Sequence, residues 1–174
     1  VGETICSGTS TNINLSSAVS GTTFDWVVTI ESGVTGATSG SGSSIVQTLT
    51  ATGISNGFVI YTITPIANGC SGSAITVQVN VTPRPVASYT GNLTYCDGAS
   101  TAIVLNSSIP GTTFTWNIAS SNLDTAFVIP GSGNTITQNL DLLNPLNTGS
   151  VTYTVLPFAN NCYGEPISIQ VQVN

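Results

Sequence analysis

Apolar and polar residues alternate with a period of two along several stretches of the chain. The clearest stretch places Phe24, Trp26 and Val28 on one face, with Thr23, Asp25 and Thr29 among the residues on the other. Alternation of this kind, bounded by turn residues, predicts half-buried β-strands. Strands with one apolar face each are expected to stack as a sandwich. The same pattern recurs at residues 59–63, 75–81, 113–118, 151–155 and 167–173.

The chain also repeats itself. Cys6-Ser-Gly and Cys96-Asp-Gly start 90 residues apart, and Cys70 and Cys162 lie 92 apart. The offset grows by one residue twice, in stretches rich in Gly, Ser and Asn, as expected when insertions are confined to loops. Two domains are therefore predicted, 1–83 and 84–174. Residues 81–86 form the boundary.

Two prolines flank the single arginine at this boundary, Pro83 and Pro85 around Arg84. Proline fixes φ and favours an extended chain, so the pattern indicates a short, stiff joint between the domains. An ordinary linker with no mechanical role is the alternative.

Aromatic residues are few, and they recur in both copies. Trp26 and Trp116 are expected to anchor the two cores together with Tyr61 and Tyr153, because each lies in phase with apolar neighbours. A ligand-stacking role for the tryptophans is the less favoured interpretation. The Trp–Tyr pairing resembles the immunoglobulin-like plan.

Gln47 and Gln138 have apolar neighbours two residues away on both sides. A buried amide must form hydrogen bonds, so a repeated contact with loop backbone is predicted. The alternative is that each glutamine lies at the edge of a sheet, where both faces of the strand are exposed to solvent. Asn68-Gly69 and Asn56-Gly57 mark tight turns.

Charged residues make up 5% of the sequence, with a net charge of −6, no His and one residue in the Lys and Arg class. Without a basic patch, nucleic acid and anionic membrane surfaces are not expected partners. The absence of His and Lys removes the usual nucleophilic systems. Carboxylates do not recur at equivalent positions in the two copies and are interpreted as solvated loop residues. No catalytic residues and no enzymatic activity are predicted.

One cysteine pair per repeat predicts two intradomain disulfides, Cys6–Cys70 and Cys96–Cys162. If residues 11–15 and the strand starting at Ile75 are parallel neighbours, Cys6 and Cys70 lie at the same end of a sheet. If residues 11–15 are instead the second strand of an immunoglobulin plan, these two cysteines start at opposite ends. Paired cysteines indicate an oxidising compartment and hence an exported protein.

No metal or other cofactor is predicted, because the sequence has no CxxC and no His. A calcium ion at the module junction, held by Asp97 and loop carbonyls, is the weaker alternative. No stretch is long and apolar enough to span a bilayer.

Five motifs of the first repeat are Thr4-Ile-Cys-Ser-Gly8, Thr23-Phe-Asp-Trp26, Tyr61-Thr-Ile-Thr-Pro65, Asn68-Gly-Cys-Ser-Gly72 and Ile75-Thr-Val-Gln-Val79. Together they resemble the PKD-like and immunoglobulin-like repeats in giant surface proteins of gliding bacteria. The resemblance implies an all-β fold of two tandem Ig-like or PKD-like sandwiches joined by a short Pro-rich linker. It also implies a cell-surface adhesin, export by type IX secretion and a role in gliding motility. Asp124-Thr-Ala126 resembles the O-glycosylation sequence of these bacteria, with sugar on Thr125.

Two functions follow as hypotheses. The first is a structural repeat of an extracellular adhesin filament. Its partners are neighbouring repeats of the chain, with surface polysaccharide or substratum bound by other regions. The second is a carbohydrate- or protein-binding accessory module of a secreted protein, with Tyr89, Tyr95 and Tyr163 as the candidate aromatic contacts.

Overall fold

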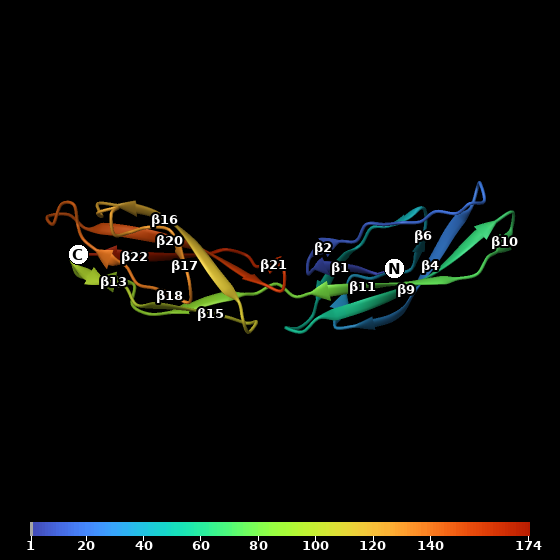
Figure 1. The fold of residues 1–174 in the computed structure, drawn as a ribbon, viewed down its shortest axis with the longest axis horizontal. Coiled ribbons are helices and arrows are strands. Elements are labelled where there is room, and N and C mark those ends of the chain that lie inside the picture. The colour runs from blue at the N-terminus through green and yellow to red at the C-terminus, as the bar shows by residue number, and fades with distance from the viewer. Residues whose placement is uncertain (1) are drawn as a thin grey trace. The chain divides into compact units, whose positions relative to one another are not determined.

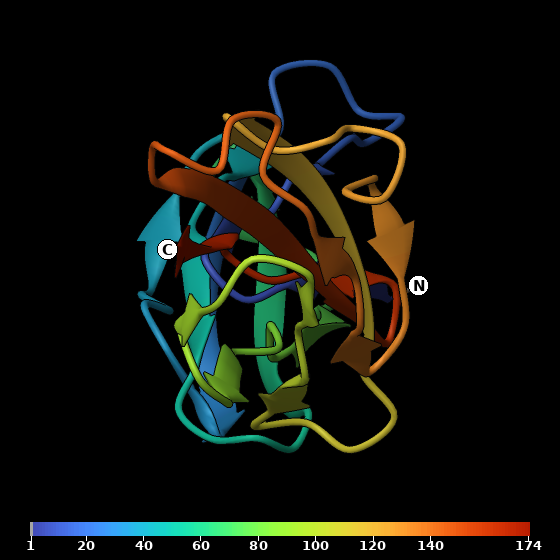
Figure 2. The ribbon, with the colours of Figure 1, turned by 90° about the vertical axis from the view of Figure 1, so that its left-hand side faces the viewer.

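The computed structural model describes residues 2–174, and these form strands and loops without a helix (Figures 1 and 2). No segment among them is therefore a helix that could cross a membrane. The chain divides into two compact units, Val1–Pro83 and Arg84–Asn174.

The larger sheet of the first unit is built from the long alternating segments. Its central strands pair antiparallel, whereas β1 and β11 run parallel with Glu3 opposite Val79 and Cys6 opposite Thr82. In spatial order the strands are β1 (Glu3–Cys6), β11 (Ile75–Thr82), β9 (Gly57–Ala67), β4 (Thr23–Ser32) and β6 (Gly40–Ser41), and β10 (Cys70–Ser71) pairs with β9.

Shorter strands form the remaining sheets of the first unit. One has the order β2 (Thr9–Ser10), β8 (Thr48–Ala51) and β5 (Val34–Thr35), and the other pairs β3 (Ile13–Asn14) with β7 (Ser44–Ile45). Leu49 of β8 and Ile45 of β7 are fully buried. These short strands therefore supply part of the core.

The second unit repeats this plan. Its larger sheet has the order β13 (Thr94–Tyr95), β22 (Ile167–Val173), β20 (Gly149–Ala159), β16 (Thr113–Ser121) and β17 (Gly131–Ser132), with β21 (Cys162–Tyr163) paired to β20. A further sheet has the order β12 (Ala87–Thr90), β15 (Ile103–Ser107) and β18 (Thr135–Ile136), and β14 (Ala99–Ser100) pairs with β19 (Asn139–Leu140).

Each unit has its own hydrophobic core on the apolar faces of these strands. Phe24 and Trp26 are buried while Thr23 and Asp25 are exposed, as the alternation predicts. The phase changes at a bulge between Val28 and Ile30, where the register of β4 against β9 shifts. Tyr61 and Tyr153 are fully buried at equivalent positions of the two cores.

The predicted tight turn at Asn56-Gly57 is wrong, because Gly57 is already the first residue of β9. The predicted turn at Asn68-Gly69 is confirmed. Both residues have positive φ, 52° and 76°, and they join β9 to β10. Two successive positive φ angles match the right-handed twist of the paired strands, which favours Asn and Gly at these positions. Asn160 and Asn161 adopt the same conformation between β20 and β21.

Candidate functional site

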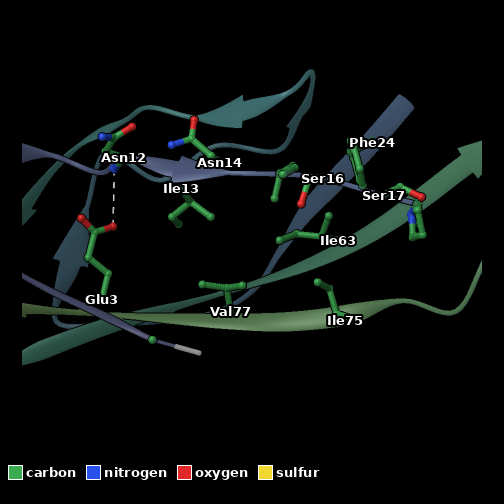
Figure 3. A pocket seen from close by; sticks show the side chains of 13 residues that line it. Glu3, Asn12, Ile13, Asn14, Ser16, Ser17, Phe24, Ile63, Ile75 and Val77 are labelled. Atoms are coloured by element: carbon green, nitrogen blue, oxygen red, sulfur yellow. Dashed lines mark hydrogen bonds between the residues drawn. The ribbon is translucent and has the colours of Figure 1, made fainter. Parts of the chain in front are cut away.

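The first unit has an apolar groove on its surface. It encloses about 690 Å³ between the segment that contains β3 and the strands β9 and β11. Figure 3 shows Ile13 pointing from β3 towards Ile63, Ile75 and Val77 on the opposite sheet. Phe24 closes one part of the groove. Ile63 is fully buried beneath it, whereas the side chain of Ile75 is 58% exposed.

The polar groups of the groove are grouped along one side. They belong to residues 12–17, together with Glu3, whose Oε2 accepts a hydrogen bond from the backbone N–H of Asn12 at 3.4 Å (Figure 3). Glu3 carries the one ionisable side chain among the residues that line the groove. An apolar floor beside a strand edge suits an extended peptide better than a charged ligand or a reacting substrate.

Gln47 forms the contact with loop backbone that its position predicts. Its Nε2 donates to the carbonyl oxygen of Thr38 at 2.7 Å, and its Oε1 accepts from the N–H of Thr38 at 2.9 Å. The Tyr61 hydroxyl donates to the same Oε1 at 2.8 Å. Burial, with a contribution from Glu31, raises the pKa of Tyr61 to about 12. This amide therefore joins the loop at Thr38 to the core.

Gln138 repeats only part of this arrangement in the second unit. Its Nε2 donates to the carbonyl oxygen of Ile129 at 2.5 Å, so the contact with loop backbone is kept. Its Oε1 and the Tyr153 hydroxyl are both buried and do not bond to each other. Burial raises the pKa of Tyr153 to about 12 as well.

A buried threonine next to each glutamine was not anticipated from the sequence. The Thr11 hydroxyl donates to the carbonyl oxygen of Ile45 at 2.8 Å and accepts the N–H of Gln47 at 3.0 Å. Thr101 forms the equivalent bonds with Ile136 and Gln138, both at 2.9 Å. The sequence does contain a signal for this contact, because each threonine stands at the same point of its repeat, two residues before an isoleucine.

The cysteines differ from the predicted pairs. Cys6 and Cys162 are disulfide-bonded, whereas Cys70 and Cys96 carry free, exposed thiols. Cys6–Cys70 and Cys96–Cys162 are therefore not the bonds present. Each repeat has one bonded and one free cysteine, at positions that are not equivalent.

The order of the strands explains why the predicted pair Cys6–Cys70 does not form. Cys6 lies opposite Thr82 at one end of β11, and Cys70 precedes Ile75 at the other end. At about 3.3 Å per residue, the seven steps along β11 separate these ends by roughly 23 Å. A disulfide needs Cα atoms within about 7 Å of each other. The strand that runs parallel beside β11 is β1. Residues 11–15, which would have to occupy that place for Cys6 and Cys70 to lie at the same end of the sheet, pair elsewhere.

The order of the strands in the second unit excludes the predicted pair Cys96–Cys162 in the same way. Tyr95, next to Cys96, lies opposite Val173 near the end of β22, whereas Cys162 precedes the start of β22 at Ile167. The two cysteines of this repeat are thus also at opposite ends of the sheet.

Alkylation of the native chain under non-reducing conditions is expected to label Cys70 and Cys96 and to leave Cys6 and Cys162 unlabelled until a reductant is added. The reason is that only the first two have accessible thiols. Peptide mass mapping measures the pattern, and Cys70→Ser and Cys96→Ser should each remove one label. Labelling of Cys6 before reduction would contradict the assignment.

The remaining candidate residues, Thr125 and Asp97, belong to the second unit. Thr125 is exposed in a turn in which the N–H of Ala126 donates to Asp124 Oδ1 at 2.9 Å. Asp97 uses its Oδ1 to accept the N–H of Leu142 at 2.7 Å, so this carboxylate oxygen has a structural partner. The described residues contain no group of three or more potential metal ligands.

The three candidate tyrosines are not gathered at one site. Tyr163 is 55% exposed and stacks at a tilt on Phe158, with ring centroids 4.6 Å apart. Tyr89 lies on β12, and the Tyr95 hydroxyl accepts the N–H of Ala102 at 3.2 Å. The pair of exposed Tyr163 and half-buried Phe158 therefore remains as a sugar-stacking candidate.

Two similar all-β units, each with sheets packed around its own core, define the class of tandem β-sandwich modules. The sequence matches the PKD-like domain family twice, over residues 3–85 and 93–174. The chain belongs to this family, and the predicted fold class of tandem Ig-like or PKD-like sandwiches is confirmed. No curated protein matches the sequence.

Two solved structures cover almost the whole chain at low similarity. The human desmocollin-1 ectodomain is 13% identical, with a TM-score of 0.43, over 99% of this chain and 40% of that one. Mouse cadherin-23 EC22-24 is also 13% identical, with a TM-score of 0.42, over 99% of this chain and 62% of the other. The chain thus spans less than two thirds of each.

Proposed function

We propose that the two modules are structural repeats of a large secreted cell-surface adhesin. Membership of the PKD-like family supports this proposal, because domains of this kind are typically extracellular and non-enzymatic. The bonded cysteines support an oxidising compartment. The groove and the buried amides carry no arrangement of nucleophile, base and oxyanion donors that would favour an enzyme.

The observation that carries the proposal is the chemistry of the exposed strand faces. Neighbouring strands are linked there by pairs of neutral hydroxyl groups. Such neutral contacts are not screened by salt, unlike exposed ion pairs. A filament built from these surfaces keeps its stability over a wide range of ionic strength. The pairs are Ser10 with Thr48 at 2.9 Å, Thr29 with Thr62 at 3.1 Å and Ser121 with Ser150 at 3.1 Å.

The unfolding temperature of the chain is expected to be the same within about 2 °C at low and at molar salt, because few charged residues contribute to it. A reductant should lower it, since the disulfide constrains the unfolded chain. Differential scanning calorimetry measures both effects. A large salt dependence would count against the spacer role, and an unchanged transition under reductant would count against the contribution of the disulfide.

The finer proposal is a gliding adhesin of the SprB type, exported by type IX secretion and glycosylated at Thr125. It rests on the motif resemblance and on the exposure of Thr125. An antibody against the chain should label intact, unpermeabilised cells of the source bacterium. Mass spectrometry of the native protein should place a glycan on the peptide with Asp124-Thr-Ala126. Intracellular signal alone would overturn the surface assignment.

A carbohydrate-binding accessory module is the second candidate, favoured by the exposed Tyr163 and its contact with half-buried Phe158. Aromatic faces are common contacts for sugar rings, but the pair is not repeated: the counterparts in the first unit are Ile66 and Ser71. A glycan screen with the native chain and Tyr163→Ala separates the candidates. Binding that is lost in Tyr163→Ala would favour the accessory module over the spacer.

A further inference from the structure

We propose that the groove of the first unit is a docking site for one extended strand, supplied by the segment that leads into this module from a preceding copy of the repeat. The occupant has the chemistry of residues 85–90, Pro-Val-Ala-Ser-Tyr-Thr. The inference depends on the repeat and the geometry of the two units, and it holds whether or not the protein is an adhesin.

The second unit contains a strand, β12, that has no counterpart among the strands of the first unit. In the second unit β15 lies between β12 and β18, with Ala87 opposite Ser107 and Thr90 opposite Val104. The equivalent strand β3 has one paired neighbour, β7. Its other edge, continued by residues 15–17, lines the groove. A strand edge of this kind is a template for pairing with a further strand.

Burial differs between the units at the positions this strand would cover. Ile103 and Leu105 on β15 are 0% and 3% exposed, whereas their counterparts Ile13 and Leu15 are only partly buried. Ile109 is 5% exposed and its counterpart Val19 is 52% exposed.

The larger sheet shows the same difference. Ile169 is fully buried, and its counterpart Val77 is only partly buried and lines the groove. The same sequence pattern therefore forms a closed core in one unit and an open groove in the other.

The strand of the second unit shows how the occupant would bind. Ala87 of β12 is 8% exposed and belongs to the hydrophobic core, while the neighbouring Val86 points outwards. The carbonyl oxygen of Val86 also accepts the N–H of Ser108 at 3.1 Å. Backbone pairing along the edge and one small side chain towards the floor are thus the main contacts.

The repeat offset identifies the source of this strand. Ile13 and Ile103, like Cys6 and Cys96, are 90 residues apart, so the counterparts of Ala87–Thr90 would precede Val1. The groove is apolar and carries one ionisable group, Glu3, so it offers little to a charged ligand. A strand from the preceding repeat would pair with the open edge of β3 and would cover the apolar floor of the groove.

The test adds the sequence of residues 83–90, Pro-Arg-Pro-Val-Ala-Ser-Tyr-Thr, directly before Val1 of the full chain. We expect the unfolding transition of the first unit to rise by about 5 °C or more, because additional apolar surface is buried. Hydrogen exchange of the amides of residues 14–17 should slow at least tenfold. Residues 104–107, already paired in the unextended chain, provide the internal reference.

The matched control carries the same extension with Asp in place of its alanine, the counterpart of Ala87. The charged side chain would have to enter the apolar floor, so this extension should give neither the stabilisation nor the protection. Equal effects of the two extensions, or no effect of either, would overturn the proposal.

Two further measurements test the alternative occupants. Light scattering should show a monomer for both the extended and the unextended chain. A dimer of the extended chain would show that the strand is exchanged between molecules, which overturns docking within one chain. Binding of a glycan that Ile75→Asp abolishes in the unextended chain would assign the groove to a ligand instead.

Discussion

Replacing Trp26 with alanine is expected to destabilise the first unit by about 3–5 kcal/mol. The side chain is 7% exposed, its Nε1 donates to the carbonyl oxygen of Thr38 at 3.1 Å, and its ring packs against Gly40. Alanine would therefore leave a cavity and remove one of the two hydrogen bonds that the Thr38 carbonyl oxygen accepts, the other coming from Gln47 Nε2. Urea unfolding followed by circular dichroism measures the loss.

The second unit provides an internal control for this substitution. Trp116 becomes the only tryptophan of Trp26→Ala, so its fluorescence reports on the second unit alone. The fluorescence midpoint should remain unchanged while the first transition moves to lower urea. A loss below about 1 kcal/mol in the first unit would contradict the role of Trp26 as a core anchor.

A milder pair of variants separates packing from hydrogen bonding. Trp116 has a buried Nε1 without a hydrogen-bond partner, in contrast to Trp26. Trp26→Phe should therefore cost about 1 kcal/mol more than Trp116→Phe. Equal costs would show that the bond to Thr38 contributes little.

Gly36→Ala is expected to destabilise the first unit by about 3 kcal/mol or more, because two costs add. Gly36 has φ of +99°, which side chains rarely adopt, and an added Cβ would lie 2.2 Å from the carbonyl oxygen of Thr48. That oxygen belongs to the backbone of β8, so it cannot move aside without disturbing the sheet. Urea unfolding of the variant and the native chain gives the difference.

Gly53→Ala is the matched control. Gly53 has no such backbone conformation and no atom within 4 Å of an added Cβ. Alanine there should be neutral or stabilise the unit by up to about 1 kcal/mol, through the lower entropy of the unfolded chain. If both variants lost the same stability, the close approach at Gly36 would not be its cause.

Much of each sandwich could be predicted from local patterns. The alternation at residues 23–26 gave the correct buried face, because side chains on a strand point to opposite sides in turn. The bulge after Val28 lay outside this reasoning, because the spacing of two continues in the sequence to Ile30, whose side chain the change of register leaves 49% exposed. Gln47 was placed correctly because a polar side chain in an apolar run must find a backbone partner.

The cysteine pairs could not be predicted in the same way. Their geometry depends on which strands are neighbours, and a period of two says nothing about spatial order. The parallel pairing of β1 with β11 moves Cys6 to the end of the sheet away from Cys70. The groove was missed for a related reason: it follows from a strand that the second unit has and the first lacks.

The parallel pairing of β1 and β11 also determines how a module responds to tension. β1 is the first strand of the larger sheet along the chain and β11 is the last, and they run side by side in the same direction. A pull on the two ends of the module therefore slides these strands past each other and loads all their hydrogen bonds together. A hairpin opened from its free end would instead release them one by one. The second unit has the same arrangement in β13 and β22. Stretching a module therefore loads the hydrogen bonds between these two strands in shear, all at once, and does not break them one after another.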